Sequence, residues 1–372
     1  MTGDLVYDAD HPVDDRYAPP DCGEIDVVAA VLADGRLSGG NPVLGAYERA
    51  LADWFTARRA IAVNSGTSAL HATLIALGVR AGDEVIVPAT APLPTAMPIL
   101  TCGAIPVIVD TRPGELGMDP GQVAARLTAR TKAAISLPLW GYPADDDPAA
   151  AVLAAADVPL IEDAAQAHGA VLRGRAVGTR YRAGCFSTHD RKLLSTGEGG
   201  FVLASDDELA DRIDFYTHLG HLRGGHGVNY KLAAPLAAIG LRRLPGLAAQ
   251  LTARRAIAAG LLAELPAQGS ALAELVHAGQ PNYYSLVLTA AADPGAAAAA
   301  LTAAGLAPDS ARYGYRPLYR QPLFAAYASD CPNAEALCQT ALQFPVHPAL
   351  PETAIHWAAG LIRALAREET PA

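Results

Sequence analysis

Short apolar runs alternate with stretches of helical periodicity over the first two thirds of the chain. An amphipathic helix is predicted over 41–57, because its large apolar residues recur at helical spacing as one stripe: Tyr47, Leu51, Trp54 and Phe55. The apolar runs that follow are typical of buried strands, and they span 60–64, 84–88, 105–110, 132–137 and 158–163. Helical segments separate them, and the one after 88 is punctuated by prolines. This alternation predicts βαβ units and an α/β fold with a mainly parallel sheet, whose ligand sites lie at the carboxyl ends of the strands.

The pattern changes near residue 240. A long helix is predicted over 236–264, and it leads into a smaller α+β part in which 283–289 is the clearest strand. We therefore expect two domains. Residues 1–240 would form a large domain with an N-terminal arm, and residues 241–372 a small C-terminal one.

Composition narrows the functional classes. The chain has 372 residues, of which 51% are hydrophobic and 18% charged, and this composition supports a large buried core. The formal net charge is −10, and no basic patch stands out, so we expect no nucleic-acid partner. The run "DPGAAAAALTAAGL" is too short and too weakly apolar to cross a membrane. A small-molecule enzyme fits these properties better than a nucleic-acid or membrane protein.

The ends and the cysteines favour a reducing compartment. The acidic start "MTGDLVYDADHPVDDRY" has no apolar signal-peptide region, so we expect a cytoplasmic protein. The five cysteines show neither a CxxC pair nor metal-ligand spacing. We therefore expect free thiols and no metal site.

The stretch "CFSTHDRKLLSTGEGGFVL" places Lys192 between two apolar segments, with strands expected at 186–188 and 201–204. A lysine is ordinarily a solvated surface charge. Burial between apolar strands lowers the pKa of an amine, however, and makes it a nucleophile toward carbonyl groups. Ser187 precedes this lysine closely and could offer its hydroxyl to an anion.

Two further stretches lie at strand ends. In "NSGTSAL", a strand ends at Asn64 and a helix follows, so the free amides at Gly66 could bind phosphate. The alternative is an ordinary helix cap made by Ser65 or Thr67. In "LIEDAAQAHGA", Glu162 and Asp163 end an apolar strand, and a carboxylate there could pair with a protonated ring nitrogen. The alternative is that Asp163 caps a following helix, on which Gln166 would point the same way one turn later.

A phosphate loop, a carboxylate and a lysine amine are together what a protein contributes to pyridoxal phosphate chemistry. The chain resembles the DegT/StrS sugar aminotransferases of fold type I. The resemblance runs from "GRLSGGNPVLGAYERALADWF" to "QFPVHPAL", through "NSGTSALHATLIALGVRAGDEVIVP", "IEDAAQAHGA", "FSTHDRKLLSTGEGG" and "GVNYKLAAPLAAIGL". It implies a large domain with a seven-stranded, mainly parallel sheet and a small α+β domain.

The resemblance also implies a role for each matching residue. Pyridoxal 5'-phosphate would form a Schiff base with Lys192, which also moves the proton. Asp163 would pair with the pyridine nitrogen, and Gln166 would contact the ring near its phenolic oxygen. The phosphate would be held by three residues of the same chain and one of a second copy, in a homodimer with shared sites: Gly66, Thr67, Ser187 and, across the interface, Asn229.

Three positions depart from the family pattern. The aromatic residue expected to stack on the ring falls in "PATAPLPT", at Pro92 or Ala91. Leu137 and Pro138 stand where a Val-His pair is usual, and Lys231 where arginine is usual. Because these positions are near the substrate side, the departures concern the substrate more than the cofactor.

The implied reaction moves an amino group from glutamate or glutamine to a keto-sugar or a ketocyclitol, in natural-product or polysaccharide biosynthesis. An alternative acceptor is a non-sugar ketone or aldehyde of secondary metabolism. A related lyase is a second alternative, but those relatives carry histidine where this chain has Lys192. A cofactor-binding regulator is a third, and the intact Lys192, Asp163 and Gln166 argue against it.

Overall fold

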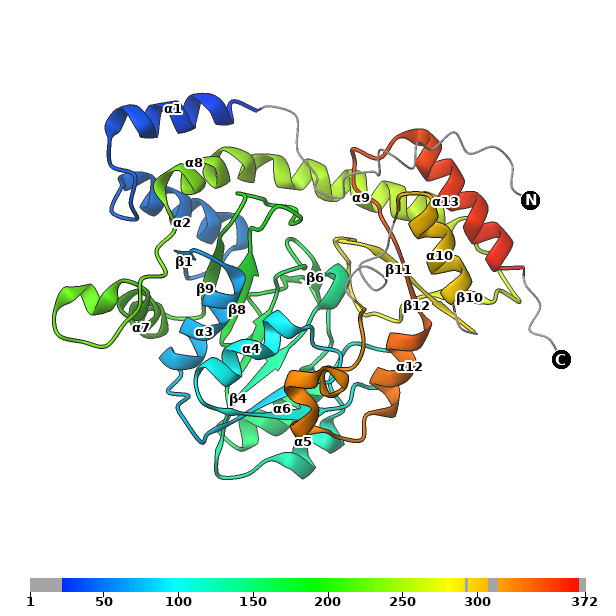
Figure 1. The fold of residues 1–372 in the computed structure, drawn as a ribbon, viewed down its shortest axis with the longest axis horizontal. Coiled ribbons are helices and arrows are strands. Elements are labelled where there is room, and N and C mark those ends of the chain that lie inside the picture. Colours follow the sequence, from blue (N-terminus) through cyan, green and yellow to red (C-terminus); the bar gives the residue numbers. More distant parts are fainter. Residues whose placement is uncertain (1–21, 292–293, 307–313, 368–372) are drawn as a thin grey trace.

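The computed structural model describes residues 22–291, 294–306 and 314–367, and a seven-stranded sheet lies at its centre (Figure 1). The strand order is β1-β9-β8-β5-β4-β2-β3. The strands are β1 (Arg59–Val63), β2 (Glu84–Pro88), β3 (Ile105–Val109), β4 (Thr131–Ser136), β5 (Leu160–Asp163), β8 (Ala183–Ser187) and β9 (Gly200–Ala204). β9 runs antiparallel to both neighbours, and the remaining pairs are parallel. The predicted mainly parallel α/β sheet is therefore confirmed.

Helices pack against this sheet because it is apolar on both faces. They are α2 (Pro42–Phe55), α3 (Gly66–Ala76), α4 (Leu93–Thr101), α5 (Pro120–Arg126), α6 (Asp147–Ala155) and α7 (Asp207–Thr217). The first helix, α1 (Glu24–Asp34), packs on α8 (Ala234–Arg243) instead. The amphipathic helix predicted over 41–57 is α2. The Asn41 side chain caps it by accepting a hydrogen bond from the Val43 amide, and Tyr47, Leu51 and Phe55 are buried. The proline-punctuated helix after 88 is α4, which contains Pro98.

The single long helix predicted over 236–264 is wrong in one respect. It is divided into α8 (Ala234–Arg243) and α9 (Leu247–Leu262) by a 3₁₀ turn, η3 (Leu244–Gly246). Pro245 explains the division, because proline has no amide to donate and its ring crowds the preceding turn of an α-helix. Figure 1 shows α8 and α9 following one another along one side of the molecule, from the large sheet to the smaller part.

The smaller part contains a three-stranded antiparallel sheet of order β10-β11-β12. Its strands are β10 (Leu272–Glu274), β11 (Leu286–Ala290) and β12 (Ala341–Phe344), and α9, α10 (Gly295–Ala303) and α13 (Glu352–Leu365) share its apolar core. The strand predicted over 283–289 begins only at Leu286, because residues 282–285 bind the large part instead. The segment with η4 (Leu318–Arg320), η5 (Pro322–Tyr327) and α12 (Pro332–Thr340) contributes to the core of the large sheet. The domain division at residue 240 stays a prediction.

Short elements complete the chain: η1 (Leu139–Gly141), η2 (Leu219–Leu222) and the hairpin of β6 (Val171–Leu172) and β7 (Arg175–Ala176). All five cysteines are free thiols, and three of them are buried. Across the described residues, no cluster of three His, Cys, Asp or Glu side chains is arranged to hold a metal ion. Within the same ranges, none of the helices combines the length and the apolar character needed to cross a membrane. The expected cytoplasmic location stays a prediction, and the N-terminal stretch read for a signal peptide lies outside the described residues.

Candidate active site

A cavity of about 400 Å³ opens at the carboxyl ends of the parallel strands. Asp163, Gln166 and Lys192 all line it, so the structure brings these three predicted site residues together. Much of the remaining wall is apolar: Pro92, Leu93, Pro94, Leu137, Pro138, Leu139 and Trp140. Tyr284, Tyr315 and Arg316 reach it from the C-terminal third of the chain.

Lys192 lies on the loop between β8 and β9. The loop is closed by hydrogen bonds from the Thr188 amide to the Gly199 carbonyl (2.9 Å) and from the Asp190 amide to the Gly197 carbonyl (3.1 Å). Gly197 and Gly199 have φ values of 91° and 145°, which residues other than glycine rarely adopt. The segment "TGEGG" therefore forms a tight turn, and the loop holds the half-buried Lys192 at the cavity.

The Lys192 amine faces an aromatic ring that the sequence patterns did not single out. Its Nζ lies 5.0 Å from the centre of the Tyr284 ring. The Asn282 side chain positions this tyrosine, because its Oδ1 accepts a hydrogen bond from the Tyr284 amide (2.7 Å). A tyrosine face attracts a cation at this distance.

Asp163 ends β5 and is buried. The Thr95 hydroxyl donates to its Oδ2 (2.6 Å) and the Ala165 amide donates to its Oδ1 (3.2 Å). Burial raises the pKa of the Asp163 carboxyl above its ordinary value, and these two hydrogen bonds and the charge of Lys192 act in the opposite direction. The result is a buried carboxyl group, held by two hydrogen bonds, that lines the cavity.

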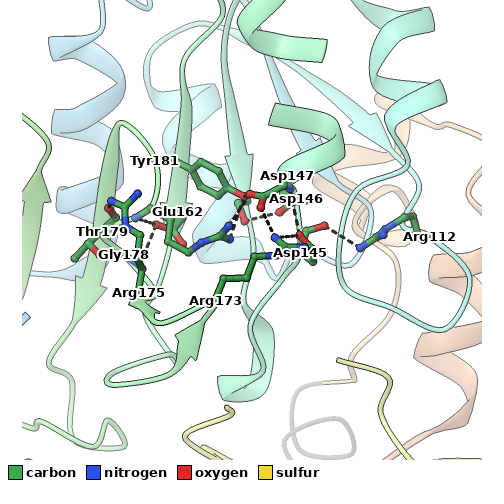
Figure 2. Close-up of polar contacts among 12 residues, drawn as sticks. Arg112, Asp145, Asp146, Asp147, Glu162, Arg173, Arg175, Gly178, Thr179 and Tyr181 are labelled. Atoms are coloured by element: carbon green, nitrogen blue, oxygen red, sulfur yellow. Dashed lines mark hydrogen bonds and ion pairs between the residues drawn. The ribbon is translucent and has the colours of Figure 1, made fainter. Parts of the chain in front are cut away.

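Glu162, the other carboxylate of this strand, points to the opposite face of the sheet, as neighbouring strand residues do. Its Oε2 accepts hydrogen bonds from the amides of Gly178 (2.9 Å) and Arg180 (3.2 Å). Burial raises the pKa of Glu162 to about 7, against the effect of these amides. Figure 2 shows this carboxylate among Gly178, Thr179 and Tyr181. Glu162 therefore belongs to the scaffold, and Asp163 to the cavity.

The acidic loop beside Glu162 is also part of the scaffold. Arg173 binds both Asp145 (2.7 Å) and Asp147, as Figure 2 shows. Asp146 between them is buried, and its Oδ1 accepts a hydrogen bond from the Met118 amide (2.6 Å). Burial raises the pKa of Asp146 to about 6. These contacts fix the loop that leads from the cavity wall into α6.

Gln166 is held from both sides. Its Oε1 accepts a hydrogen bond from the Trp140 amide (2.7 Å), and its carbonyl accepts one from the Asn282 side chain (2.8 Å). The helix expected after Asp163 is absent, because residues 164–169 form successive turns. Asp163 therefore caps no helix, although its Oδ1 accepts the Ala165 amide at the first turn. Gln166 reaches the cavity through these turns rather than through helical spacing.

The predicted phosphate loop lies beside the end of β8. Ser65 is the N-cap of α3, and its side chain accepts a hydrogen bond from the Ser68 amide (3.0 Å). The first main-chain bond of the helix runs from Ala69 to Ser65, which leaves the amides of Gly66 and Thr67 without helical partners. A Cβ on Gly66 would lie 2.8 Å from the Ser187 Cβ. The interpretation of Ser65 as the helix cap is therefore confirmed. Gly66 also lies against Ser187, and phosphate binding by Gly66, Thr67 and Ser187 stays a prediction.

Four predicted site residues are not part of the cavity lining: Gly66, Thr67, Ser187 and Asn229. Asn229 also stands apart from the other three. It is exposed, and it pairs through its backbone with His218. Its predicted role in the site of a second copy is compatible with this exposure and stays a prediction.

Some of the departures from the family pattern face the cavity, whereas Lys231 is not part of its lining. Pro92, Leu137 and Pro138 line it, whereas Ala91 is buried behind it. The sequence patterns did not single out several lining residues, among them Thr95, Trp140 and Tyr284. Thr95 was visible in the sequence as the last residue of the quoted segment "PATAPLPT". Its role was not visible, because its partner Asp163 lies 68 residues away.

Comparison with known proteins gives the same family over nearly the whole chain. Residues 21–360 match the model of the DegT/DnrJ/EryC1/StrS aminotransferase family. The GDP-perosamine synthase of Caulobacter vibrioides is 32% identical over 322 residues, which are 83% of this chain and 86% of that protein. The UDP-2-acetamido-2-deoxy-3-oxo-D-glucuronate aminotransferase of Pseudomonas aeruginosa is 32% identical over 88% of this chain and 92% of its own. The L-glutamine:2-deoxy-scyllo-inosose aminotransferase of Streptomyces lividus is 39% identical over 55% of this chain and 50% of its own.

Solved structures agree with these sequence relatives. DesV of S. venezuelae superposes with a TM-score of 0.85 at 29% identity, over 93% of this chain and 95% of that one. The sugar aminotransferase CalS13 of Micromonospora echinospora gives a TM-score of 0.84 at 29% identity, over 94% and 98% of the two chains. The predicted fold type I architecture is thereby confirmed. With the cavity, the family match and these neighbours in agreement, the chain belongs to the DegT/DnrJ/EryC1/StrS aminotransferase family.

Proposed function

We propose that the chain transfers an amino group from glutamate or glutamine to the carbonyl carbon of a keto-sugar or a ketocyclitol, with pyridoxal 5'-phosphate as its cofactor. The observation that carries the proposal is the position of Lys192, Asp163 and Gln166 around one cavity. The names of the relatives support it, since one is a GDP-perosamine synthase and another acts on 2-deoxy-scyllo-inosose.

The residues of the cavity fit this cofactor. Asp163 is a buried carboxylate whose pKa is raised by burial, so a protonated ring nitrogen would stabilise its charge. Gly66 fits a phosphate, because its lack of a Cβ lets the start of α3 lie against Ser187. The amides of a helix N-terminus and a hydroxyl are suitable donors to a phosphate oxygen.

When bound, pyridoxal phosphate supplies an electron sink for the carbanion that forms at the amino-bearing carbon. Lys192 would accept the proton from that carbon and deliver it to the cofactor carbon on the other side of the same nitrogen. Asp163 would keep a proton on the ring nitrogen through its negative charge. The Tyr284 ring, 5.0 Å from Nζ, would favour the amine when it carries the proton.

The chain offers a sharp test, because it contains only three lysines: Lys132, Lys192 and Lys231. We expect borohydride reduction of the cofactor-loaded protein to attach the cofactor covalently to the peptide that contains Lys192. Lys192→Ala should lose both this attachment and the visible absorption band that the cofactor gives when it is bound to the lysine. Lys132→Ala is the matched control, since Lys132 is exposed on β4, and it should keep both. Attachment to Lys132 or Lys231 would contradict the assignment.

A non-sugar ketone or aldehyde is a second candidate acceptor. Pro92, Leu137 and Pro138 give the cavity an apolar wall without side-chain donors. Sugar hydroxyls facing such a wall would lose hydrogen bonds to water without replacement. Loading the enzyme with pyridoxamine phosphate and comparing a ketocyclitol with an apolar ketone of similar size decides between the two. The compound with the larger kcat/KM identifies the class of amino acceptor.

The proposed active unit is a homodimer with shared sites. Asn229 is exposed and would donate to the phosphate held by a second copy. Apolar side chains nearby in the sequence are also exposed, among them Leu219 at 36% and Leu222 at 83% of their surface. Association with a second copy would remove this apolar surface from water.

A further inference from the structure

Two arginines line the cavity together with Lys192. Arg191 precedes that lysine on the β8–β9 loop and is half-buried, whereas Arg316 is exposed and stands where the cavity meets solvent. Among the described residues that line the cavity, Asp163 is the one carboxylate. Its two oxygens already accept hydrogen bonds from Thr95 and Ala165. The lining is thus rich in basic groups, although the whole chain carries a formal charge of −10.

Arg316 is fixed in place by its neighbours in the chain. The Tyr315 hydroxyl donates to the Thr90 carbonyl (2.6 Å), and the Leu318 amide donates to the Ala89 carbonyl (2.8 Å). The Tyr315 ring also packs edge-on against Trp140, with 5.2 Å between the ring centres. These contacts attach the segment on both sides of Arg316 to the residues that follow β2.

The guanidinium itself has a neutral partner. Its Nη2 donates to Gln321 Oε1 (3.1 Å), and within residues 22–291, 294–306 and 314–367 no carboxylate forms an ion pair with Arg316. Arg320, four residues later, is different: it is also exposed, but it binds Glu335 (2.7 Å) and does not line the cavity. A positioned guanidinium without a carboxylate partner can bind a planar or tetrahedral anion through two hydrogen bonds.

We propose that Arg316, with Arg191 from the Lys192 loop, forms an anion subsite at the mouth of the cavity that binds a carboxylate or phosphate group of a substrate. The inference rests on the proposed aminotransferase function. It adds that one of the two substrates is recognised through an anion. A carboxylate would belong to the amino donor, and a phosphate to an acceptor linked to a nucleotide. A positive cavity on an acidic protein also concentrates such anions locally.

The test measures binding without turnover, using two probes that carry no amino or keto group. Glutarate represents the donor carboxylate, and UDP represents a nucleotide phosphate. Calorimetric titration of the cofactor-loaded protein should show that Arg316→Gln weakens one of them by about tenfold or more, which is the loss expected for one charge-assisted hydrogen-bonded contact. The affected probe identifies the source of the anion. Arg320→Gln is the matched control and should leave both dissociation constants within twofold.

The subsite would be refuted if Arg316→Gln left both dissociation constants within twofold, or if neither probe bound the wild-type protein at millimolar concentration. Cofactor affinity should be the same in Arg316→Gln as in the wild type, because Arg316 is not among the residues proposed to hold the cofactor. The proposed function is tested separately, by conversion of the visible band with glutamate or glutamine. If the protein binds a probe through Arg316 but its visible band is not converted, the result would support the subsite and contradict the proposed function.

Discussion

The Thr95 hydroxyl should control how readily Asp163 keeps its negative charge. Thr95 is 1% exposed, and its Oγ1 donates to Asp163 Oδ2 over 2.6 Å. Thr95→Val keeps the shape of the side chain and removes the donor. The Ala165 amide, at 3.2 Å from the other oxygen, cannot replace it. The carboxylate would therefore lose the shorter of its two hydrogen bonds.

The size of the effect follows from the chemistry of that bond. A hydrogen bond to an ionised group contributes about 1.5–3 kcal/mol, and here the acceptor is a buried carboxylate. Since 1.36 kcal/mol corresponds to a factor of ten, its loss should raise the proton affinity of Asp163 by about 10- to 100-fold. Burial already raises the pKa of this carboxyl above its ordinary value, so the change acts in the same direction. Less of the carboxylate would then be ionised to pair with a protonated ring nitrogen.

Carbon-13 NMR of apoprotein with labelled aspartate carboxyl groups measures this directly. The Asp163 signal is identified by its absence in Asp163→Asn, and its midpoint is followed against pH. Thr95→Val should move that midpoint to higher pH, whereas Thr95→Ser, which keeps the hydroxyl, should leave it close to the wild type. An unchanged or lower midpoint in Thr95→Val would refute the view that this hydroxyl stabilises the charge.

Three further predictions concern the cradle, the assembly and the buried scaffold. Gly66→Ala should weaken pyridoxal phosphate binding about tenfold or more in spectroscopic titration, because its Cβ has no room beside β8, whereas Gly260→Ala has open space and should bind normally. Mixing inactive Lys192→Ala with inactive Asn229→Asp should restore partial activity if mixed dimers form, and no recovery would mean that Asn229 does not serve a partner's site. Burial raises the pKa of Glu162 from 4.5 to about 7, so its contribution to stability is present below pH 4.5 and is lost as the pH rises to about 7. As the pH rises over this range, the melting temperature of Glu162→Gln should therefore fall less than that of the wild type. Parallel curves of melting temperature against pH would contradict this role of Glu162.

The fold was largely accessible from the sequence because its strands are continuous apolar runs. Residues 84–88, for example, are buried at every position, so the run "EVIVP" was enough to place β2. Asp163 was accessible for a related reason, since the carboxyl end of a parallel strand is where ligands bind. The break between α8 and α9 was visible as Pro245 and was overlooked, because the apolar spacing continues across it.

Contacts between distant parts of the chain could not be predicted in the same way. Thr95 meets Asp163 across 68 residues, and Tyr315 meets Thr90 across 225. No helical or strand periodicity links residues so far apart in the sequence. They meet because of how the helices and loops pack on the sheet. The turns after Asp163 were mistaken for a helix because "AAQAHGA" has high helix propensity, whereas Asn282 binds the carbonyls of Gln166 and His168 and holds the turns in place.

The reversed strand β9 has a consequence for the order in which the site assembles. β8 and β9 follow one another in the chain and are joined by the Lys192 loop (residues 188–199), so this hairpin closes a much smaller loop than the pairing of β1 with β9 does. The phosphate cradle requires β1 to pair with β9, which brings Val63 beside Gly200, and only then does Gly66 reach the end of β8. We therefore expect the lysine to be positioned before the cradle. A cofactor that needs both would bind after the slowest long-range pairing, and it would protect the protein by slowing unfolding rather than by speeding folding.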